Sequence, residues 1–337
     1  MGITQRKIGL DLVRVFATLF VLSVHFFANT YFYSTPVDGK NMYLQVFLRM
    51  FFLICVPLFM ILTGYLQLNK DPNKDYYKKI YPILIVYLIY SLLAILTNVF
   101  IFKEEKSISE WIGAVLNFKA DGYAWYVNMY IGLFLIAPFL NILYNNIQTK
   151  KQKQLLILVF LIITALPSFF NGKARGALYF PDFWIQLYPI TYYFIGNYIR
   201  EYQLKISKMV GVFCLVLITL IECWIEIHYV SDVFLGMAGS YSSLIVVMHA
   251  TIFFLLFYDV NFNGGGLFLK LLSIISVLSL DIYLASYITD RIVYKYFLEH
   301  HFQSQQQFLY WFFPAVGTTF IFALTLSYIR YKFIKVR

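Results

Sequence analysis

The sequence predicts an all-α polytopic membrane protein, a bundle of about ten transmembrane helices with both termini in the cytoplasm. Three observations lead to this prediction. First, 61% of the 337 residues are hydrophobic and 13% are charged, whereas soluble domains carry about 25% charged residues. Second, apolar runs of about 20 residues, long enough to cross a bilayer as helices, recur along the whole chain. Third, the Lys and Arg residues are divided unevenly between alternate loops.

Ten apolar runs separated by polar loops are expected to be the spans. They cover residues 8–30, 42–68, 80–102, 123–145, 154–171, 182–200, 206–228, 241–260, 270–297 and 307–331. The first run is too long for the core of a signal peptide, contains charge and lacks a small-residue cleavage site, so we expect it to be retained. The longest polar connection, 103–122, includes an apolar stretch at Trp111 that favours a short interfacial helix. The chain, 1–337, is therefore expected to be a single membrane domain without an extramembrane domain.

The distribution of positive charge predicts the orientation. Of the 27 Lys and Arg residues, 17 fall in the loops and termini of one side, which is predicted to be cytoplasmic. Six fall on the other side: Lys40, Lys103, Lys106, Lys119, Lys173 and Arg175. Four lie within spans: Arg14, Arg49, Arg291 and Lys295. Because the net charge of +10 is spread over short loops in this way, it indicates membrane topology and not a nucleic-acid partner.

The three cysteines indicate packing. Cys55, Cys214 and Cys223 all fall in apolar runs, and their spacing fits neither a disulfide framework nor a metal site. We therefore expect no metal.

Arg14 and His25 are the most informative polar residues, because both lie in the first span. Eleven residues of helix bring two side chains within about 20° of one face, separated by roughly 16 Å. Charge inside a bilayer costs about 3 kcal/mol or more and usually faces a polar interior. Asp11 lies one turn before Arg14, so the two are expected to pair. Arg14 is either a snorkelling residue balanced by Asp11 or an anchor for a cytoplasmic ligand, and His25 is either a packed core residue or a base.

Further charges fall at a similar depth in the predicted outer half of other spans. Arg49, Glu222 and Arg291 are expected either to line an outward-facing polar pocket with His25 or to form structural pairs such as Arg291–Glu222. Asp281 is expected in the middle of the ninth span, far from both surfaces. His249 has no charged neighbour at helical spacing and is expected to be a core residue.

Several motifs together resemble the acyltransferase-3 family of bacterial integral membrane O-acyltransferases. Asp11-Leu-Val-Arg14, with His25 eleven residues after the Arg, is similar to the family's first helix. Further segments that resemble family motifs are V-P-L-F-M-I-L-T-G-Y at 56–65, W-Y-V-N-M-Y-I-G-L-F-L-I-A-P at 125–138, Y-Y-F-I-G at 192–196 and S-L-D-I-Y-L-A-S at 279–286. Their order and the Arg14–His25 spacing make the resemblance fairly specific, and it covers essentially the whole chain.

The chain departs from the family pattern at four positions. Met60 replaces a usual Phe and Thr63 a usual Ser in the second span. In the ninth span, Asp281 stands where Gly is common and Ser286 where His is common, which puts any role of that second His in doubt. The extracellular hydrolase-like domain of some relatives is not expected here.

The resemblance implies transfer of an acyl group, usually acetyl, from cytoplasmic acetyl-coenzyme A to a hydroxyl of a cell-surface polysaccharide or lipid-linked sugar, in the bacterial plasma membrane. Arg14, with Asp11, is expected on the donor side. His25 is expected to act as a general base or as an acyl relay. Arg49 and Tyr65 are weaker candidates for the acceptor side or the oxyanion, and Glu222, Asp281 and Arg291 are further acceptor-side candidates.

Two other classes of function compete with the acyltransferase. Buried charges also suit a transporter or flippase for a sugar-linked substrate, although no repeat or pair of broken helices is evident. A membrane sensor or anchoring module is the third reading. The acceptor glycan, the acyl group and the oligomeric state, a homo-oligomer included, are left open.

Overall fold

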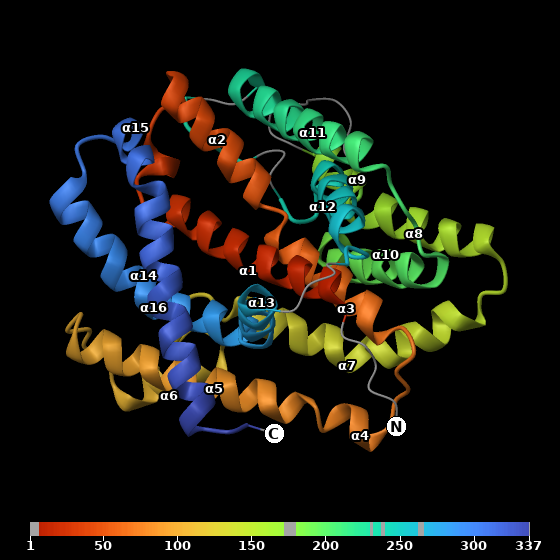
Figure 1. Cartoon of the computed structure of the whole chain (residues 1–337), viewed down its shortest axis with the longest axis horizontal. Helices are drawn as coiled ribbons and strands as arrows, with labels where there is room; N and C mark the ends of the chain where they lie inside the picture. The colour runs from red at the N-terminus through yellow and green to blue at the C-terminus, as the bar shows by residue number, and fades with distance from the viewer. Residues whose placement is uncertain (1–6, 172–179, 230–231, 237–239, 262–265, 337) are drawn as a thin grey trace.

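The computed structural model describes residues 7–171, 180–229, 232–236, 240–261 and 266–336 (Figure 1). Its regular structure is almost entirely helical, with one isolated bridge between Pro36 and Val233. The α-helices are α1 (Ile8–Ala28), α2 (Lys40–Phe52), α3 (Cys55–Gln67), α4 (Lys74–Tyr77), α5 (Ile80–Phe100), α6 (Ile108–Leu116), α7 (Trp125–Asn146), α8 (Lys150–Thr164), α9 (Leu166–Phe170), α10 (Tyr188–Tyr202), α11 (Lys208–Tyr229), α12 (Leu244–Phe257), α13 (Leu267–Val277), α14 (Ser279–His301), α15 (Gln305–Phe308) and α16 (Phe312–Phe333). Arg6, Lys173, Arg175 and Arg337, which entered the charge count, lie outside the described residues.

The predicted class is confirmed: this is an all-α polytopic membrane protein. Seven helical segments of the described chain are long and apolar enough to cross a bilayer, and the pair α13–α14 makes an eighth if it counts as one span. Each of the ten predicted spans corresponds to a helix or a helix pair. However, α10 and α12 have 15 and 14 residues, fewer than the roughly 20 that a single crossing needs. The count of ten and the cytoplasmic termini therefore stay predictions.

Helix α1 occupies the centre of the bundle (Figure 1). It contacts α2, α3, α12, α13, α14 and α16, and 78% of its apolar window is buried. The first span is therefore surrounded by protein on most sides. Its polar side chains face other helices, where partners can satisfy them, and this avoids the cost of exposing them to lipid.

Two predicted spans are interrupted. The predicted span 42–68 consists of α2 and α3, which are separated at Leu53 and Ile54. Pro57 has no N–H to donate to the carbonyl of Leu53, so the helix cannot continue regularly through this point. The predicted span 270–297 is two helices, α13 and α14, bent by 73° at Leu278. This bend places Asp281 in the first turn of α14, which corrects its expected position in the middle of a long span.

The second and sixth predicted spans meet through two glycines. A Cβ added to Gly64 in α3 would lie 2.1 Å from the carbonyl oxygen of Tyr193, and one added to Gly196 in α10 would lie 2.1 Å from that of Ile61. Small residues allow helix backbones to approach closely where lipid gives no hydrophobic driving force. Both glycines belong to motifs singled out in the sequence, and their role here is close packing.

The expected short helix near Trp111 is present as α6. Ser107 and Glu110 form a capping box that begins it. Its residues Ile108, Ile112 and Leu116 are strongly exposed at a spacing of four. This exposed apolar face is typical of a helix lying in the membrane interface.

Candidate active site

The register between α1 and α14 brings His25 to a buried carboxylate. Arg14 donates a hydrogen bond to Ser276, just before α14 begins (3.2 Å), and His25 meets Asp290 further along α14. Ser276 precedes Asp290 in the chain as Arg14 precedes His25, so α1 and the bent segment α13–α14 pass each other in the same chain direction. The bend between α13 and α14 therefore sets which residues of α14 reach the level of His25.

His25 lies against Asp290 and Tyr123. Its Nδ1 atom is 3.2 Å from Oδ2 of Asp290, although the N–H is not aimed at that oxygen, so the contact is electrostatic and not a full hydrogen bond. The Tyr123 ring stacks on the imidazole, with 3.7 Å between centroids. His25 is 9% exposed and the Asp290 side chain is fully buried. The carboxylate can thus stabilise a positive charge on the imidazole with little screening by water.

A short polar chain fixes this arrangement. The Tyr123 hydroxyl donates to Oδ2 of Asp290 at 2.8 Å and accepts from Nδ2 of Asn29 at 2.8 Å. The Tyr283 hydroxyl donates to the carbonyl oxygen of Tyr123. The aromatic ring that covers His25 is therefore held through both its hydroxyl and its backbone.

Two carboxylate oxygens beside this chain have unused hydrogen-bonding capacity. Within the described ranges, Oδ1 of Asp290 and Oδ2 of Asp121 are buried and accept no hydrogen bond. Oδ1 of Asp121 accepts the backbone N–H of Tyr123 at 2.8 Å. Burial, reinforced by the nearby charge of Asp290, raises the pKa of Asp121 to about 8. Buried acceptors without donors are rare in folded proteins and are often completed by a ligand or water.

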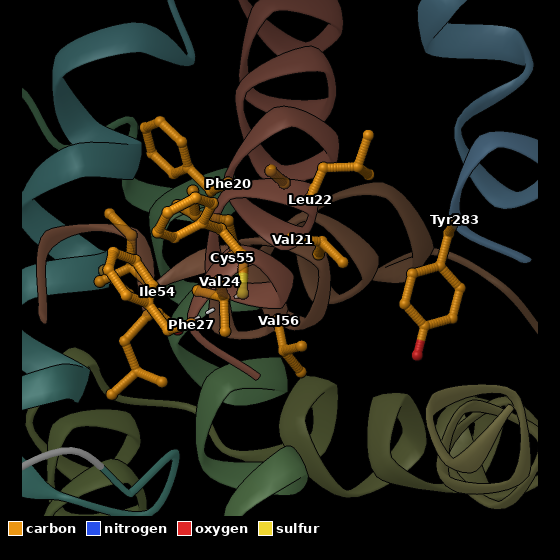
Figure 2. Packing of buried hydrophobic residues seen from close by; sticks show 14 of the residues in the cluster. Phe20, Val21, Leu22, Val24, Phe27, Ile54, Cys55, Val56 and Tyr283 are labelled. Atoms are coloured by element: carbon orange, nitrogen blue, oxygen red, sulfur yellow. Dashed lines mark hydrogen bonds between the residues drawn. The ribbon is translucent and has the colours of Figure 1, made fainter. Parts of the chain in front are cut away.

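A cavity of about 200 Å³ extends from Arg14 toward His25. Its lining from α3 includes Val56 and Gln67, which are eleven positions apart, so the cavity runs roughly 16 Å along that helix. Arg14 lies in its wall, and Tyr283, whose ring centroid is 6.3 Å from that of His25, also lines it. Figure 2 shows Val21 and Val56 on the side of the buried cluster nearer to the Tyr283 ring. The cavity can therefore lead an elongated molecule from the level of Arg14 to the vicinity of His25.

The structure places Asp11 and Arg14 around one hydroxyl. The Oγ atom of Ser276 donates to Oδ1 of Asp11 at 2.6 Å and accepts from Arg14. Ser276 of α13 thus bridges Asp11 and Arg14, the two side chains that were expected to pair.

Tyr65 lies at the other end of α1 from His25. Its hydroxyl accepts a hydrogen bond from Nζ of Lys7 at 3.1 Å, and Arg200 lies 5.1 Å from its ring centroid. Lys7 precedes His25 by 18 residues, about 27 Å along a helix. The expectation that Tyr65 belongs to the acceptor side does not fit this position, because the contact with Lys7 puts it at the end expected to receive the donor.

The expected pocket of His25, Arg49, Glu222 and Arg291 is not assembled as a unit. Arg49 donates to the Tyr33 hydroxyl at 2.8 Å. Nδ1 of His249 lies 3.3 Å from Oε2 of Glu222, and both side chains are fully buried. His249 is therefore a core residue, as expected, and it has in addition a carboxyl partner on another helix.

Arg291 has partners on a different side from Glu222. It donates to Glu104 at 2.8 Å and to Asn98, so the suggested pair Arg291–Glu222 is wrong. The hydrogen bond from Arg291 holds the pKa of Glu104 below its ordinary value. This contact ties the loop before α6 to the residue that follows Asp290.

Asp281 forms a structural pair. Arg330 donates to both of its carboxylate oxygens at 2.6 Å, and the Tyr90 hydroxyl donates to Oδ1 at 3.2 Å. Its carboxylate is therefore occupied on α16, away from the contacts of His25.

The sequence reading missed Asp290, Asp121, Tyr123 and Asn29. Asp290 could have been predicted from the sequence. It is a charged residue inside an apolar span, which is the same property that makes the adjacent Arg291 a candidate. The other three lie at or near helix ends, where polar residues are common and carry no signal. No group of three potential metal ligands occurs within the described part of the chain.

Comparison with known families identifies the family of the chain. A family model described as an acyltransferase domain matches residues 7–328, almost the whole chain. No curated protein and no solved structure matches the chain.

Proposed function

The chain belongs to the acyltransferase-3 family of membrane acyltransferases, and we propose that it transfers an acetyl group from cytoplasmic acetyl-coenzyme A to a hydroxyl of a cell-surface polysaccharide or lipid-linked sugar. The proposed location is the bacterial plasma membrane, which the family and the membrane-spanning helices support.

One observation carries the proposal: a buried His–Asp pair stands beside a cavity whose wall contains Arg14. His25 contacts Asp290 through Nδ1, and within the described residues no hydrogen bond engages its Nε2. An imidazole whose Nδ1 side faces a carboxylate is suited to accept a proton at the opposite nitrogen, because the carboxylate stabilises the positive charge that forms. The adjoining cavity offers a place for the donor's acyl arm.

The proposed reaction is a direct transfer with His25 as general base. Nε2 of His25 takes the proton of the acceptor hydroxyl while the hydroxyl oxygen forms a bond to the thioester carbonyl carbon. The carbon–sulfur bond then breaks, and the thiolate leaves with the proton carried by the imidazole. Asp290 stabilises the intervening imidazolium, and His25 returns to its neutral form. This route needs no acyl-enzyme, and the placement of Asp290 favours it because it supports a transiently protonated His.

Acceptor binding is supported by the unused oxygens of Asp290 and Asp121. The free oxygen of Asp290 can accept a hydrogen bond from a sugar hydroxyl, and the Asp121 carboxyl, whose pKa is raised to about 8, can donate one to a sugar oxygen. Satisfying such buried polar groups stabilises the complex, whereas a molecule without hydroxyl groups leaves their desolvation cost uncompensated. The chemistry of the site thus fits a polyhydroxylated acceptor.

The test uses purified wild-type protein and the His25→Ala variant in lipid nanodiscs, with labelled acetyl-coenzyme A and extracts of lipid-linked and polymeric glycans. We expect label to enter a glycan with the wild type, and we expect the variant to keep its elution profile and lose at least about a hundredfold in rate. If the wild type consumes acetyl-coenzyme A with none of the glycan fractions, the proposal is contradicted, and transport of a sugar-linked substrate becomes the favoured hypothesis. Acetyl analysis of surface glycans from cells with and without the protein then identifies the acceptor.

A further inference from the structure

Two cations converge on one tyrosine at the Lys7 end of α1. Nζ of Lys7 lies 5.6 Å and Cζ of Arg200 lies 5.1 Å from the centroid of the Tyr65 ring. Lys7 is exposed and Arg200 half-buried, so both are accessible to a ligand, whereas Tyr65 is 1% exposed. The buried tyrosine ring therefore packs against both cations and holds them near each other.

The neighbouring carboxylates are engaged elsewhere. Asp11, one turn from Lys7, accepts from Ser276. Glu201, next to Arg200, binds Lys153 at 2.7 Å. Asp259 lies 3.8 Å from Lys205. Within the described ranges no carboxylate forms an ion pair with Lys7 or Arg200, so their mutual repulsion is not relieved by an acid of the protein.

This pair of cations lies in line with the cavity. Lys7, Arg14 and Val21 are spaced by seven residues, which puts them near one face of α1, and the latter two line the cavity. On α3, Tyr65 directly precedes Leu66 and Gln67, which also line it. The two cations therefore stand at the end of the cavity remote from His25.

We infer that Lys7 and Arg200, supported by Tyr65, form an anion site that binds phosphate groups at the nucleotide end of the acyl donor. The inference rests on the proposed function, because it assigns the donor's phosphates to one end of the path and its acyl group to the other. Lysine and arginine are the usual phosphate ligands. Coenzyme A carries its phosphates and its thiol at opposite ends of a long arm, which suits the roughly 27 Å between Lys7 and His25 along α1.

Tyr65 has the role of a positioning residue. Its hydroxyl accepts from Lys7 and its ring carries both cations, so Tyr65→Phe loses one contact and keeps the other. We expect a smaller effect from Tyr65→Phe than from Lys7→Ala, and an effect on donor KM alone.

The experiment measures steady-state transfer by the full-length protein in nanodiscs with three donors: acetyl-coenzyme A, its 3′-dephospho form and acetyl-pantetheine. Lys7→Ala and Arg200→Gln are expected to raise KM for acetyl-coenzyme A about tenfold, the size of one charged hydrogen bond, with kcat changed less than about twofold. Neither variant is expected to alter KM for acetyl-pantetheine, which lacks the nucleotide phosphates. Lys151→Ala, an exposed cation in the first turn of α8, is the matched control and is expected to behave as the wild type.

Three outcomes would overturn the inference: unchanged KM for acetyl-coenzyme A in both variants, an equal rise with acetyl-pantetheine, or a rise seen only in nanodiscs containing phosphatidylglycerol, which would assign the site to lipid phosphate. Equilibrium binding of coenzyme A tests the anion site separately from the proposed function. Binding that depends on Lys7 and Arg200 without any transfer would uphold the anion site and contradict the proposed function. Transfer that is unchanged in both variants would uphold the proposed function and contradict the anion site.

Discussion

Among the single residues, Asp290 is expected to influence the proposed reaction most, because it can stabilise a positive charge on His25. It is fully buried, contacts His25 and accepts from Tyr123. Asp281 is its natural comparison, because it lies nine positions earlier on the same helix and is equally enclosed, yet it is bound by Arg330 on α16. The same residue type thus contacts the proposed catalytic histidine at one position and pairs two helices at the other.

We predict that Asp290→Asn lowers kcat at least about a hundredfold, since an amide cannot stabilise the imidazolium of His25. Donor KM should change less than about threefold, and Asp290→Glu should recover part of the rate. The measurement is initial rate against donor concentration. Asp281→Asn is the control: it should lower the free energy of unfolding by about 3–5 kcal/mol by leaving Arg330 unpaired and keep kcat per folded molecule. Equal kcat losses in both variants would contradict the distinction.

The pKa of Asp121 predicts a pH dependence of stability. The folded protein holds this proton up to about pH 8, whereas the unfolded chain releases it near the ordinary aspartate pKa of 3.8. Between these values the folded state binds more protons, so the free energy of unfolding contributed by this group falls as pH rises. Thermal midpoints of the wild type from pH 5 to 8 should therefore decline more steeply than those of Asp121→Asn. Parallel profiles would contradict the prediction.

At the scale of elements, the contact between α3 and α10 shows how the family-like motifs serve packing. Gly64 and Gly196 let the two backbones meet, and Tyr193 of the same α10 motif donates to Asn141 of α7 at 2.7 Å. The cavity wall contributed by α3 therefore depends on glycines whose contacts are with the backbone of the facing helix.

We predict that Gly64→Ala lowers the thermal midpoint clearly, because its Cβ would collide with the Tyr193 carbonyl oxygen and overpacking of this kind costs about 1–3 kcal/mol. Gly132→Ala is the matched control, since a Cβ there meets nothing within 4 Å and should be neutral or slightly stabilising. The measurement is thermal unfolding in detergent. A Gly64→Ala protein as stable as the control would remove the packing argument.

At the scale of the whole molecule, the central position of α1 connects the two ends of the proposed reaction. Lys7 and Arg200, both counted on the predicted cytoplasmic side, meet at Tyr65. Glu104 and Arg291, near the predicted outer side, meet at the other end. These two contacts lie at opposite ends of the bundle, in agreement with the predicted sides of their loops, and the orientation itself stays a prediction.

We predict that the loops containing Lys40 and Lys106 face outward and those containing Lys151 and Lys205 face the cytoplasm. Single cysteines at these positions, in a chain whose Cys55, Cys214 and Cys223 are replaced by Ser, allow the test. A membrane-impermeant thiol reagent applied to intact cells should label the first two and reach the others only after lysis. Labelling of Lys151→Cys in intact cells would reverse the orientation.

The class, the first span and the Arg14–His25 register could be predicted from the sequence, because hydropathy and helical periodicity act locally along the chain. The sequence also indicated the family, since the motifs lie in a fixed order. The bend at Leu278, the opposed glycines and the partners of each buried charge were decided only by tertiary structure. Asp290 meets His25, and Glu222 meets His249, through contacts between helices distant in sequence, and no periodicity within one helix specifies the residue that faces it from another.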